Sequence, residues 1–192
     1  MNGSVSAGFL KAMELEMTLI DTKTFNVIPR TSKLKIISSV WAFEVKHFTD
    51  GSVKKIKARL CAQEFEQVEG RDYFETFSPM VQWLTVQLIL IMTILFDLEN
   101  QQIDYTAAFV QALIETDVYV ETPHLFSTQG YIWKLKMSIY DLKQSSQNYF
   151  LHMQGKLEKL GFTQSTADLC LFISPTFICL IYVDNVLLYI HL

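Results

Sequence analysis

Apolar positions along the chain recur with helical spacing in three segments. Residues 7–20 carry an apolar stripe and predict a short helix. Residues 83–98 are apolar on most faces, which predicts a buried helix. A third helix is expected after residue 145, where Ser145 or Ser146 can act as the N-cap and Gly161 stands where a left-handed C-terminal residue belongs.

Extended runs alternate with these helices. Residues 36–46 and 53–65 are β-rich and flank Asp50-Gly51, a typical hairpin signal. Shorter runs cover residues 101–105, 118–121 and 131–136. Residues 177–183 and 186–190 form a second predicted hairpin, with Asp184-Asn185 between its strands. Helices mixed with hairpins indicate an α+β fold.

Composition agrees with a globular chain. Of 192 residues, 50% are apolar and 19% are charged, enough for one buried core or two small lobes. The longest apolar run, residues 84–96, is too short to cross a bilayer. No membrane partner is therefore expected, and nothing at the N-terminus resembles an export signal. Three cysteines without metal-ligand spacing suit a reducing compartment.

Charge is unevenly distributed although the net charge is only −4. Residues 1–60 carry an excess of Lys and Arg, whereas residues 61–130 are strongly acidic. The basic first third could contact phosphates, or it could simply be a solvated surface.

Two aspartates stand directly after apolar, strand-like runs. Asp104 lies within a predicted strand, where a carboxylate is disfavoured unless it is paired. Asp184 and Asn185 are also good turn residues, so a hairpin turn there needs no function. Brought together, Asp104 and Asp184 could hold the magnesium ions of an in-line phosphoryl transfer. Asn185 stands where such a site would have another carboxylate.

Five blocks of residues occur in a characteristic order. They are Lys57-Ala58-Arg59-Leu60 through Glu75-Thr76-Phe77-Ser78-Pro79; Gln102-Ile103-Asp104 through Ala108-Phe109 with Val118-Tyr119; Lys134-Leu135 through Leu142-Lys143-Gln144; Leu160-Gly161-Phe162 with Asp168 and Cys170-Leu171; and Tyr182-Val183-Asp184. In this order they resemble the reverse transcriptase of Ty1/copia-type retrotransposons. The resemblance implies interleaved fingers and palm, with an antiparallel palm sheet backed by helices.

The resemblance also implies roles for single residues. Asp104 and Asp184 would be the metal-binding carboxylates for Mg²⁺ or Mn²⁺, and the Tyr105 backbone carbonyl would face the same ions. Arg59 and Lys57 would reach the triphosphate. Phe109 would contact the sugar of the incoming nucleotide, although it could equally be a core aromatic. Gln144 would lie against the nucleotide or template.

The chain departs from the family pattern at several positions. Asn185 replaces an aspartate of the hairpin, and Asp141 and Ala112 replace glycines. Ser146 and Gln147 stand for a proline and an arginine, and Gln63-Glu64 for a lysine and a glycine. We therefore expect a degenerate, inactive copy of an RNA-directed DNA polymerase, a pseudoenzyme.

The extent of the chain adds further expectations. Residues 1–8 are expected to be a tail, and residues 9–192 a Gag-Pol fragment cut after the hairpin, without thumb, ribonuclease H or integrase. Family-like partners would be a primer–template of RNA or DNA and a dNTP, in the cytoplasm or nucleus. A non-catalytic nucleic-acid-binding module and a relic without molecular role are the alternatives.

Overall fold

The chain folds into two compact units in the computed structural model, which describes residues 3–21 and 23–190. Unit 1 contains Met1–Thr76 and Phe109–Ser145, and unit 2 contains Phe77–Ala108 and Ser146–Leu192. Each unit is built from two separate stretches of the chain, so neither corresponds to one continuous half. The sequence had allowed for two such lobes.

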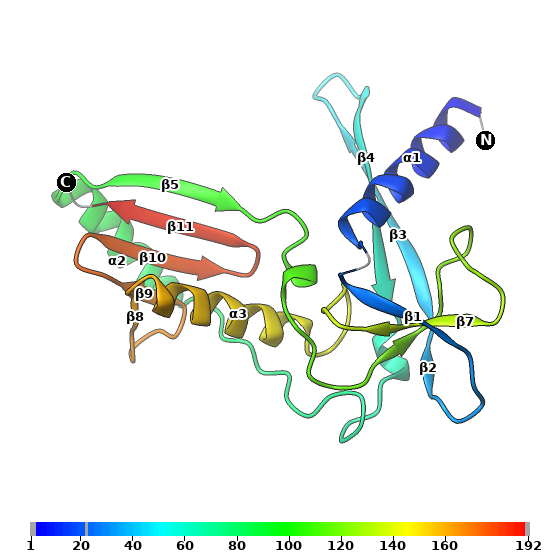
Figure 1. Cartoon of the computed structure of the whole chain (residues 1–192). Helices are drawn as coiled ribbons and strands as arrows, with labels where there is room; N and C mark the ends of the chain where they lie inside the picture. The colour runs from blue at the N-terminus through cyan, green and yellow to red at the C-terminus, as the bar shows by residue number, and fades with distance from the viewer. Residues whose placement is uncertain (1–2, 22, 191–192) are drawn as a thin grey trace. The chain divides into compact units, whose positions relative to one another are not determined.

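Unit 1 combines a helix, a four-stranded sheet and a long hairpin (Figure 1). The helix α1 (Gly3–Leu19) begins inside the segment expected to be a tail and packs on β4. The sheet has the order β1 (Phe25–Pro29), β7 (Tyr131–Leu135), β6 (Tyr119–Val120), β2 (Ile36–Ile37). The hairpin pairs β3 (Ser39–His47) with β4 (Val53–Ala62), and two single 3₁₀ turns, η1 (Glu64–Glu66) and η2 (Phe109–Gln111), complete the unit.

The core of unit 1 lies between the sheet, the base of the hairpin and α1. Phe25 of β1 stacks on Trp133 of β7, with ring centroids 3.8 Å apart. The other members are buried aliphatic side chains, among them Ile20, Ile37, Leu60, Val118, Val120, Leu135, Ile139 and Leu142. Ile132 and Trp133 are neighbours in β7 and both are buried, so side chains on both faces of this strand are covered.

The predicted strand over residues 36–46 is two strands in the structure. The chain leaves β2 at Ser38, whose backbone N–H and hydroxyl both donate to the carboxylate of Glu66, at 2.7 and 3.1 Å. β2 pairs in parallel with β6, whereas β3 pairs antiparallel with β4. The Glu66 carboxylate of η1 therefore interrupts, at Ser38, a segment that the apolar pattern predicted to be one strand.

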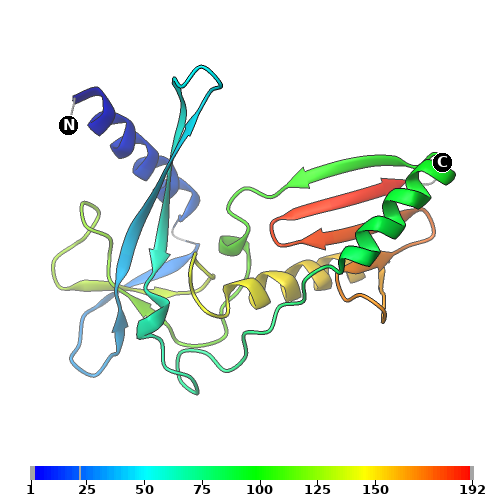
Figure 2. The same ribbon diagram turned by 180° about the vertical axis from the view of Figure 1, so that it is seen from behind.

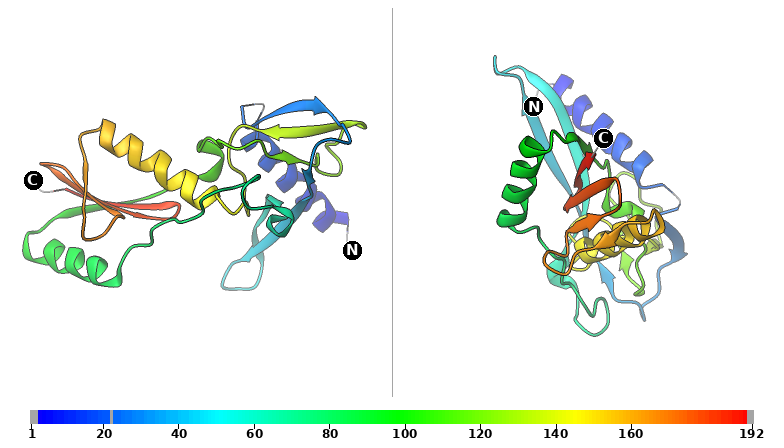
Figure 3. Two further views of the ribbon diagram at one scale, coloured as in Figure 1. Left: turned by 90° about the horizontal axis from the view of Figure 1, so that it is seen from below. Right: turned by 90° about the vertical axis from the view of Figure 1, so that its left-hand side faces the viewer.

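Unit 2 is a five-stranded antiparallel sheet between two helices (Figure 2). Its strand order is β5 (Glu99–Asp104), β11 (Asn185–Ile190), β10 (Phe177–Tyr182), β9 (Leu171–Ile173), β8 (Thr163–Gln164). Leu171 packs on the side of α2 (Trp83–Leu95), while the neighbouring Phe172 contacts Phe150 of α3 (Ser145–Lys159). Because successive strand residues face opposite sides, the two helices cover opposite faces (Figure 3).

The helix α2 is shorter and far less buried than its sequence predicts. It ends at Leu95, and Ile89 is its one buried residue. Ile89 packs with Leu98 and Tyr189 against one face of the sheet. Apolarity on all sides does not reveal how many sides are covered, and here a single sheet covers one side. The prediction of a buried helix is therefore wrong.

The buried carboxylate of Asp168 fixes the start of α2. Its two oxygens accept the backbone N–H groups of Gln82 and Cys170, each at 2.9 Å. Burial acts to raise the pKa of Asp168, but hydrogen bonds from Thr85, Gln82 and Cys170 outweigh it and hold that pKa below its usual range. The negative charge also suits the N-terminus of a helix.

The described part of the chain is thus a mixed α+β fold with three α-helices and mainly antiparallel sheets. Gly161 adopts φ +87°, which confirms the left-handed end expected for α3. Within residues 3–21 and 23–190, no helix is both long and apolar enough to cross a membrane.

Candidate metal and nucleotide site

The end of the unit 2 sheet brings the two predicted acidic positions together. Asp104 is the last residue of β5 and stands opposite Asn185, the first residue of β11. The next residue, Tyr105, donates its backbone N–H to the carbonyl oxygen of Asp184 at 3.0 Å. Both aspartates are exposed. Residues eighty positions apart in the chain are therefore neighbours at one sheet end, and a shared metal ion stays a prediction.

The hairpin turn lies one residue earlier than predicted. β10 ends at Tyr182 and β11 begins at Asn185, so the turn residues are Val183 and Asp184. Val183 has φ +52°, whereas Asp184 is not in the left-handed region. These φ signs are those of a type II′ turn, which normally has glycine first. A β-branched residue in this conformation stores backbone strain next to the acidic group.

Asn185 acts as a hydrogen-bond donor to the neighbouring acid. Its amide nitrogen donates to Asp184 Oδ1 at 3.0 Å, and its carbonyl oxygen accepts from Gln102 Nε2 at 3.0 Å. Both ends of the amide are therefore engaged. In this arrangement Asn185 stabilises the Asp184 carboxylate in place of the third carboxylate that the family pattern would supply.

Asp104 and Asp184 are the two carboxylates that this sheet end offers to a cation. Magnesium is commonly held by one or two protein carboxylates, and substrate phosphates and water supply the remaining oxygens. Asp104 and Asp184 fit that description. Within the part of the chain that the structure describes, no group of three or more His, Cys, Asp or Glu residues could hold a metal ion.

An aromatic side chain that the sequence did not single out lies beneath this sheet end. Tyr149 of α3 is buried and meets Tyr105 edge to face, with ring centroids 6.5 Å apart. Burial raises the pKa of Tyr149, and Tyr105 and the negative charge of Asp184 raise it further. In the sequence, the helical spacing between Tyr149 and Met153 could have indicated that Tyr149 belongs to the core. That spacing does not indicate that Tyr149 lies near Asp184.

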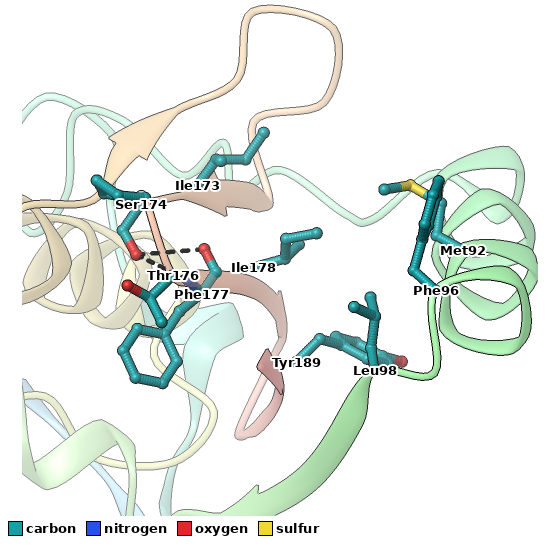
Figure 4. A pocket seen from close by; sticks show the side chains of 10 residues that line it. Met92, Phe96, Leu98, Ile173, Ser174, Thr176, Phe177, Ile178 and Tyr189 are labelled. Atoms are coloured by element: carbon teal, nitrogen blue, oxygen red, sulfur yellow. Dashed lines mark hydrogen bonds between the residues drawn. The ribbon is translucent and has the colours of Figure 1, made fainter. Parts of the chain in front are cut away.

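A separate apolar hollow lies at the other end of the β10–β11 hairpin (Figure 4). Its volume is about 370 Å³. Met92 of α2 and Phe96, which directly follows α2, border it on one side, and Ile178 and Tyr189 of the sheet on the other. Ser174 and Thr176 are polar residues of its lining, and no acid belongs to it. The hollow therefore offers no carboxylate to a metal ion.

The residues predicted to meet a nucleotide's phosphates and sugar lie in unit 1. Arg59 of β4 is 3.6 Å from the carboxylate of Glu44, and its guanidinium lies 5.8 Å from the ring centroid of Tyr140. That ring meets Phe109 edge to face at 5.3 Å. Lys57 stands directly opposite Glu44 in the hairpin. Tyr140, which the sequence interpretation gave no role, thus connects two predicted site residues.

Gln144 is 4% exposed and belongs to a buried hydrogen-bond network. Its carbonyl oxygen accepts from Gln67 Nε2 at 3.0 Å, and its amide nitrogen donates to the backbone carbonyl of Asp72 at 2.9 Å and to the Thr116 hydroxyl at 3.3 Å. Gln67 in turn accepts the backbone N–H of Lys143. In this structure Gln144 joins loops of unit 1, and a nucleotide contact stays a prediction.

Asp141 adopts φ +62°, so a residue other than glycine occupies a left-handed position. Asp is among the side chains that tolerate this region best. Burial raises the pKa of the adjacent Cys61 thiol to about 12, with a further contribution from Asp141. All three cysteines are buried and reduced, so none provides an exposed thiolate.

Comparison with known proteins identifies what the chain resembles. Residues 22–191 match the family described as reverse transcriptase (RNA-dependent DNA polymerase). The Retrovirus-related Pol polyprotein from transposon RE1 of Arabidopsis thaliana is 31% identical over 88% of the chain. The corresponding polyprotein from transposon TNT 1-94 of Nicotiana tabacum is 29% identical over 93%. The Transposon Ty1-ER2 Gag-Pol polyprotein of Saccharomyces cerevisiae is 27% identical over 91%.

These relatives are much longer proteins. The matched region is 12% of the RE1 polyprotein, 14% of the TNT 1-94 polyprotein and 10% of the Ty1-ER2 polyprotein. The chain therefore spans only the reverse transcriptase part of such polyproteins.

Proposed function

The chain belongs to the reverse transcriptase family of Ty1/copia-type Pol polyproteins, and we propose that it is a catalytically impaired fingers-and-palm fragment that still binds a divalent cation and nucleic acid. The observation that carries the cation site is the pairing of Asp104 with Asn185, beside Asp184, at one end of the unit 2 sheet. Unit 2 is the palm in this proposal, and unit 1 provides the fingers.

In this proposal the two aspartates bind the ion together. When bound, a divalent cation such as Mg²⁺ or Mn²⁺ neutralises charge on the oxygens of a transferring phosphoryl group. Strand pairing between β5 and β11 fixes Asp104, and the strained turn presents Asp184. The protein's contribution is therefore the positioning of one oxygen ligand at the end of a strand and of another in the adjoining turn.

Within unit 1, the family resemblance assigns nucleotide contacts to Arg59 and Lys57. The Arg59 guanidinium can grip phosphate oxygens in bidentate fashion, with Lys57 nearby on the same strand. Glu44 lies within ion-pair distance of Arg59 and opposite Lys57, so a triphosphate would have to displace a carboxylate. That competition weakens nucleotide binding without any change in the metal site.

Impairment follows from the chemistry of Asn185. An amide oxygen carries no negative charge, and here it already accepts from Gln102. Two divalent cations would bring four positive charges to a site with two carboxylates. We therefore expect one ion to bind and primer extension to stay at background, since the second ion of an in-line displacement lacks a ligand.

The test is a Mn²⁺ titration followed by electron paramagnetic resonance, combined with primer extension. The wild-type chain should bind Mn²⁺, and Asp104→Asn should weaken binding at least about tenfold, because one of two carboxylates is lost. Glu99→Gln is the matched control at the opposite end of β5. Equal Mn²⁺ affinity in wild type and Asp104→Asn would overturn the cation site. Extension well above background by the wild type would overturn the impairment alone.

A second function, nucleic-acid binding without catalysis, is favoured by the tip of the β3–β4 hairpin. Lys46, His47, Lys54 and Lys55 are exposed there. Lys54 lies 5.6 Å from the ring centroid of Phe48, which is itself exposed. Basic groups around an exposed aromatic ring suit phosphate contact combined with base stacking.

A salt titration of primer–template binding tests this second function. Affinity should fall steeply with salt, because each neutralised phosphate releases a counterion. Lys54→Glu combined with Lys55→Glu should weaken binding, whereas Lys33→Glu combined with Lys35→Glu, outside the hairpin, should have a smaller effect. Salt-independent binding, or equal losses in both double variants, would contradict a role for the hairpin tip.

A further inference from the structure

The outer side of α2 presents a row of exposed apolar residues with the spacing of a helix–helix contact. Leu84, Leu88, Ile91 and Leu95 follow one another at intervals of four, three and four residues, and all four are exposed. This alternation places side chains in one seam along a helix and is the pattern by which two helices interdigitate. The side of α2 around Ile89 packs on its own sheet, whereas the four seam residues are exposed, so this sheet does not cover the seam.

The apolar surface extends beyond the four seam residues. Trp83, Leu90 and Ile94 flank the seam, and the seven side chains are between 49% and 82% exposed. With about 150 Å² for a fully exposed side chain of this size, the surface is on the order of 700 Å². The largest apolar patch of a typical monomer is roughly 300–600 Å², whereas each partner of a standard interface buries about 800 Å².

The charge pattern favours a second copy of this chain as the occupant. α2 contains no charged residue, so two copies can pair without burying charge. The nearest acids, Asp97 and Glu99, follow its C-terminal end. In an antiparallel pair they lie beside the positive N-terminal end of the other helix, where negative charge is stabilising. A parallel pair would instead bring like charges together, and an anionic lipid surface would be repelled by them.

We propose that the exposed seam of α2 is a homodimer interface, in which α2 of two copies pack antiparallel about a twofold axis between Leu88 and Ile91. Such an interface is isologous, because the same patch on both copies forms it. The helix α2 is about 20 Å long, the length of its 13 residues at 1.5 Å each. The proposal is independent of metal and nucleic-acid binding.

The oligomeric state of the full chain tests the proposal. Sedimentation equilibrium of the wild type should show a reversible monomer–dimer equilibrium. Ile91→Lys should shift it to monomer, because a charge is then buried at the centre of the seam. The matched control is Leu151→Lys on the outer side of α3: both residues are 54% exposed and lie on helices of unit 2. Circular dichroism verifies that each variant is folded.

Disulfide trapping tests the orientation. The native cysteines are buried, so an introduced thiol on α2 reports on the interface. A mixture of Leu84→Cys and Leu95→Cys chains should form mixed disulfide dimers, and each variant alone should form few. Efficient trapping of Leu84→Cys with itself would overturn the antiparallel arrangement. A wild-type chain that stays monomeric, forms larger aggregates without a defined dimer, or binds lipid vesicles through α2 would overturn the homodimer.

Discussion

Replacing Asn185 with aspartate tests whether the sheet end of unit 2 is a metal site. In the wild type, Asn185 Nδ2 donates to Asp184 Oδ1 at 3.0 Å. The substitution removes this hydrogen bond and places a second negative charge beside Asp184, with Asp104 opposite. We expect Asn185→Asp to destabilise the metal-free chain and to strengthen metal binding, two effects of opposite sign.

The magnitude follows from the geometry. Two charges about 4 Å apart repel by about 1 kcal/mol in water and about 4 kcal/mol at the effective dielectric constant of a protein surface. Because Asp184 is exposed, solvent screening favours the lower value. With the lost hydrogen bond, the free energy of unfolding without metal should fall by about 1–2 kcal/mol.

Metal should reverse this loss. A third carboxylate that raises Mn²⁺ affinity about tenfold adds about 1.4 kcal/mol of stabilisation at saturation. The assay is urea unfolding in EDTA and in saturating Mn²⁺, for wild type and variant. Asn100→Asp, at the opposite end of β5, is the control and should show no added metal dependence. If Mn²⁺ stabilises Asn185→Asp no more than it stabilises wild type, the acidic group is not a metal site.

Three further substitutions test buried polar side chains of the two units. Burial raises the pKa of Glu16 on α1, so its ionised form is disfavoured in the folded state. Glu16→Gln should therefore stabilise the chain at neutral pH and have no effect below about pH 4, where the wild-type carboxyl is protonated. The exposed control Glu14→Gln should have little effect at either pH. Asp168→Asn should lower the free energy of unfolding by about 1–3 kcal/mol at neutral pH, as measured by urea unfolding. This difference between variant and wild type should vanish at pH values below the lowered pKa of Asp168, where the wild-type carboxylate is protonated. Gln144→Leu leaves the buried amide of Gln67 without its acceptor and should cost about 1–3 kcal/mol in the same assay.

The sequence predicted the order of elements well because local patterns decide most of them. The hairpin over β3 and β4 and the helix α3 follow from alternation, from helical spacing, and from Gly51 and Gly161, both of which adopt positive φ. The strands that sequence reasoning missed are short: β1 has five residues, β9 three and β8 two. A periodicity of two cannot be distinguished over the two or three residues of β8 and β9. β1 is defined by its pairing with β7, which lies more than a hundred residues later in the chain.

The candidate site was predictable to a different degree in its two parts. Asp104 and Asp184 were found because acids after apolar strand runs are unusual, and strand pairing then brought them together. The environments of Arg59 and Gln144 were not predictable. Glu44 reaches Arg59 through hairpin register, and Gln144 is buried by loops from distant parts of the chain. Residue type indicates what a side chain can bind, but tertiary contacts decide whether it is already occupied.

The amide at position 185 has a structural consequence beyond the lost ligand. Three carboxylates crowded at one sheet end repel one another unless a cation neutralises them. Asn185 removes one of these charges and adds hydrogen bonds to Asp184 and Gln102, so strand pairing at the turn no longer depends on metal. In the function we propose, the residue that would weaken catalysis also stabilises the metal-free hairpin, which holds the left-handed Val183. With asparagine in place of aspartate at position 185, we expect the sheet end to keep its backbone shape and to carry one negative charge fewer.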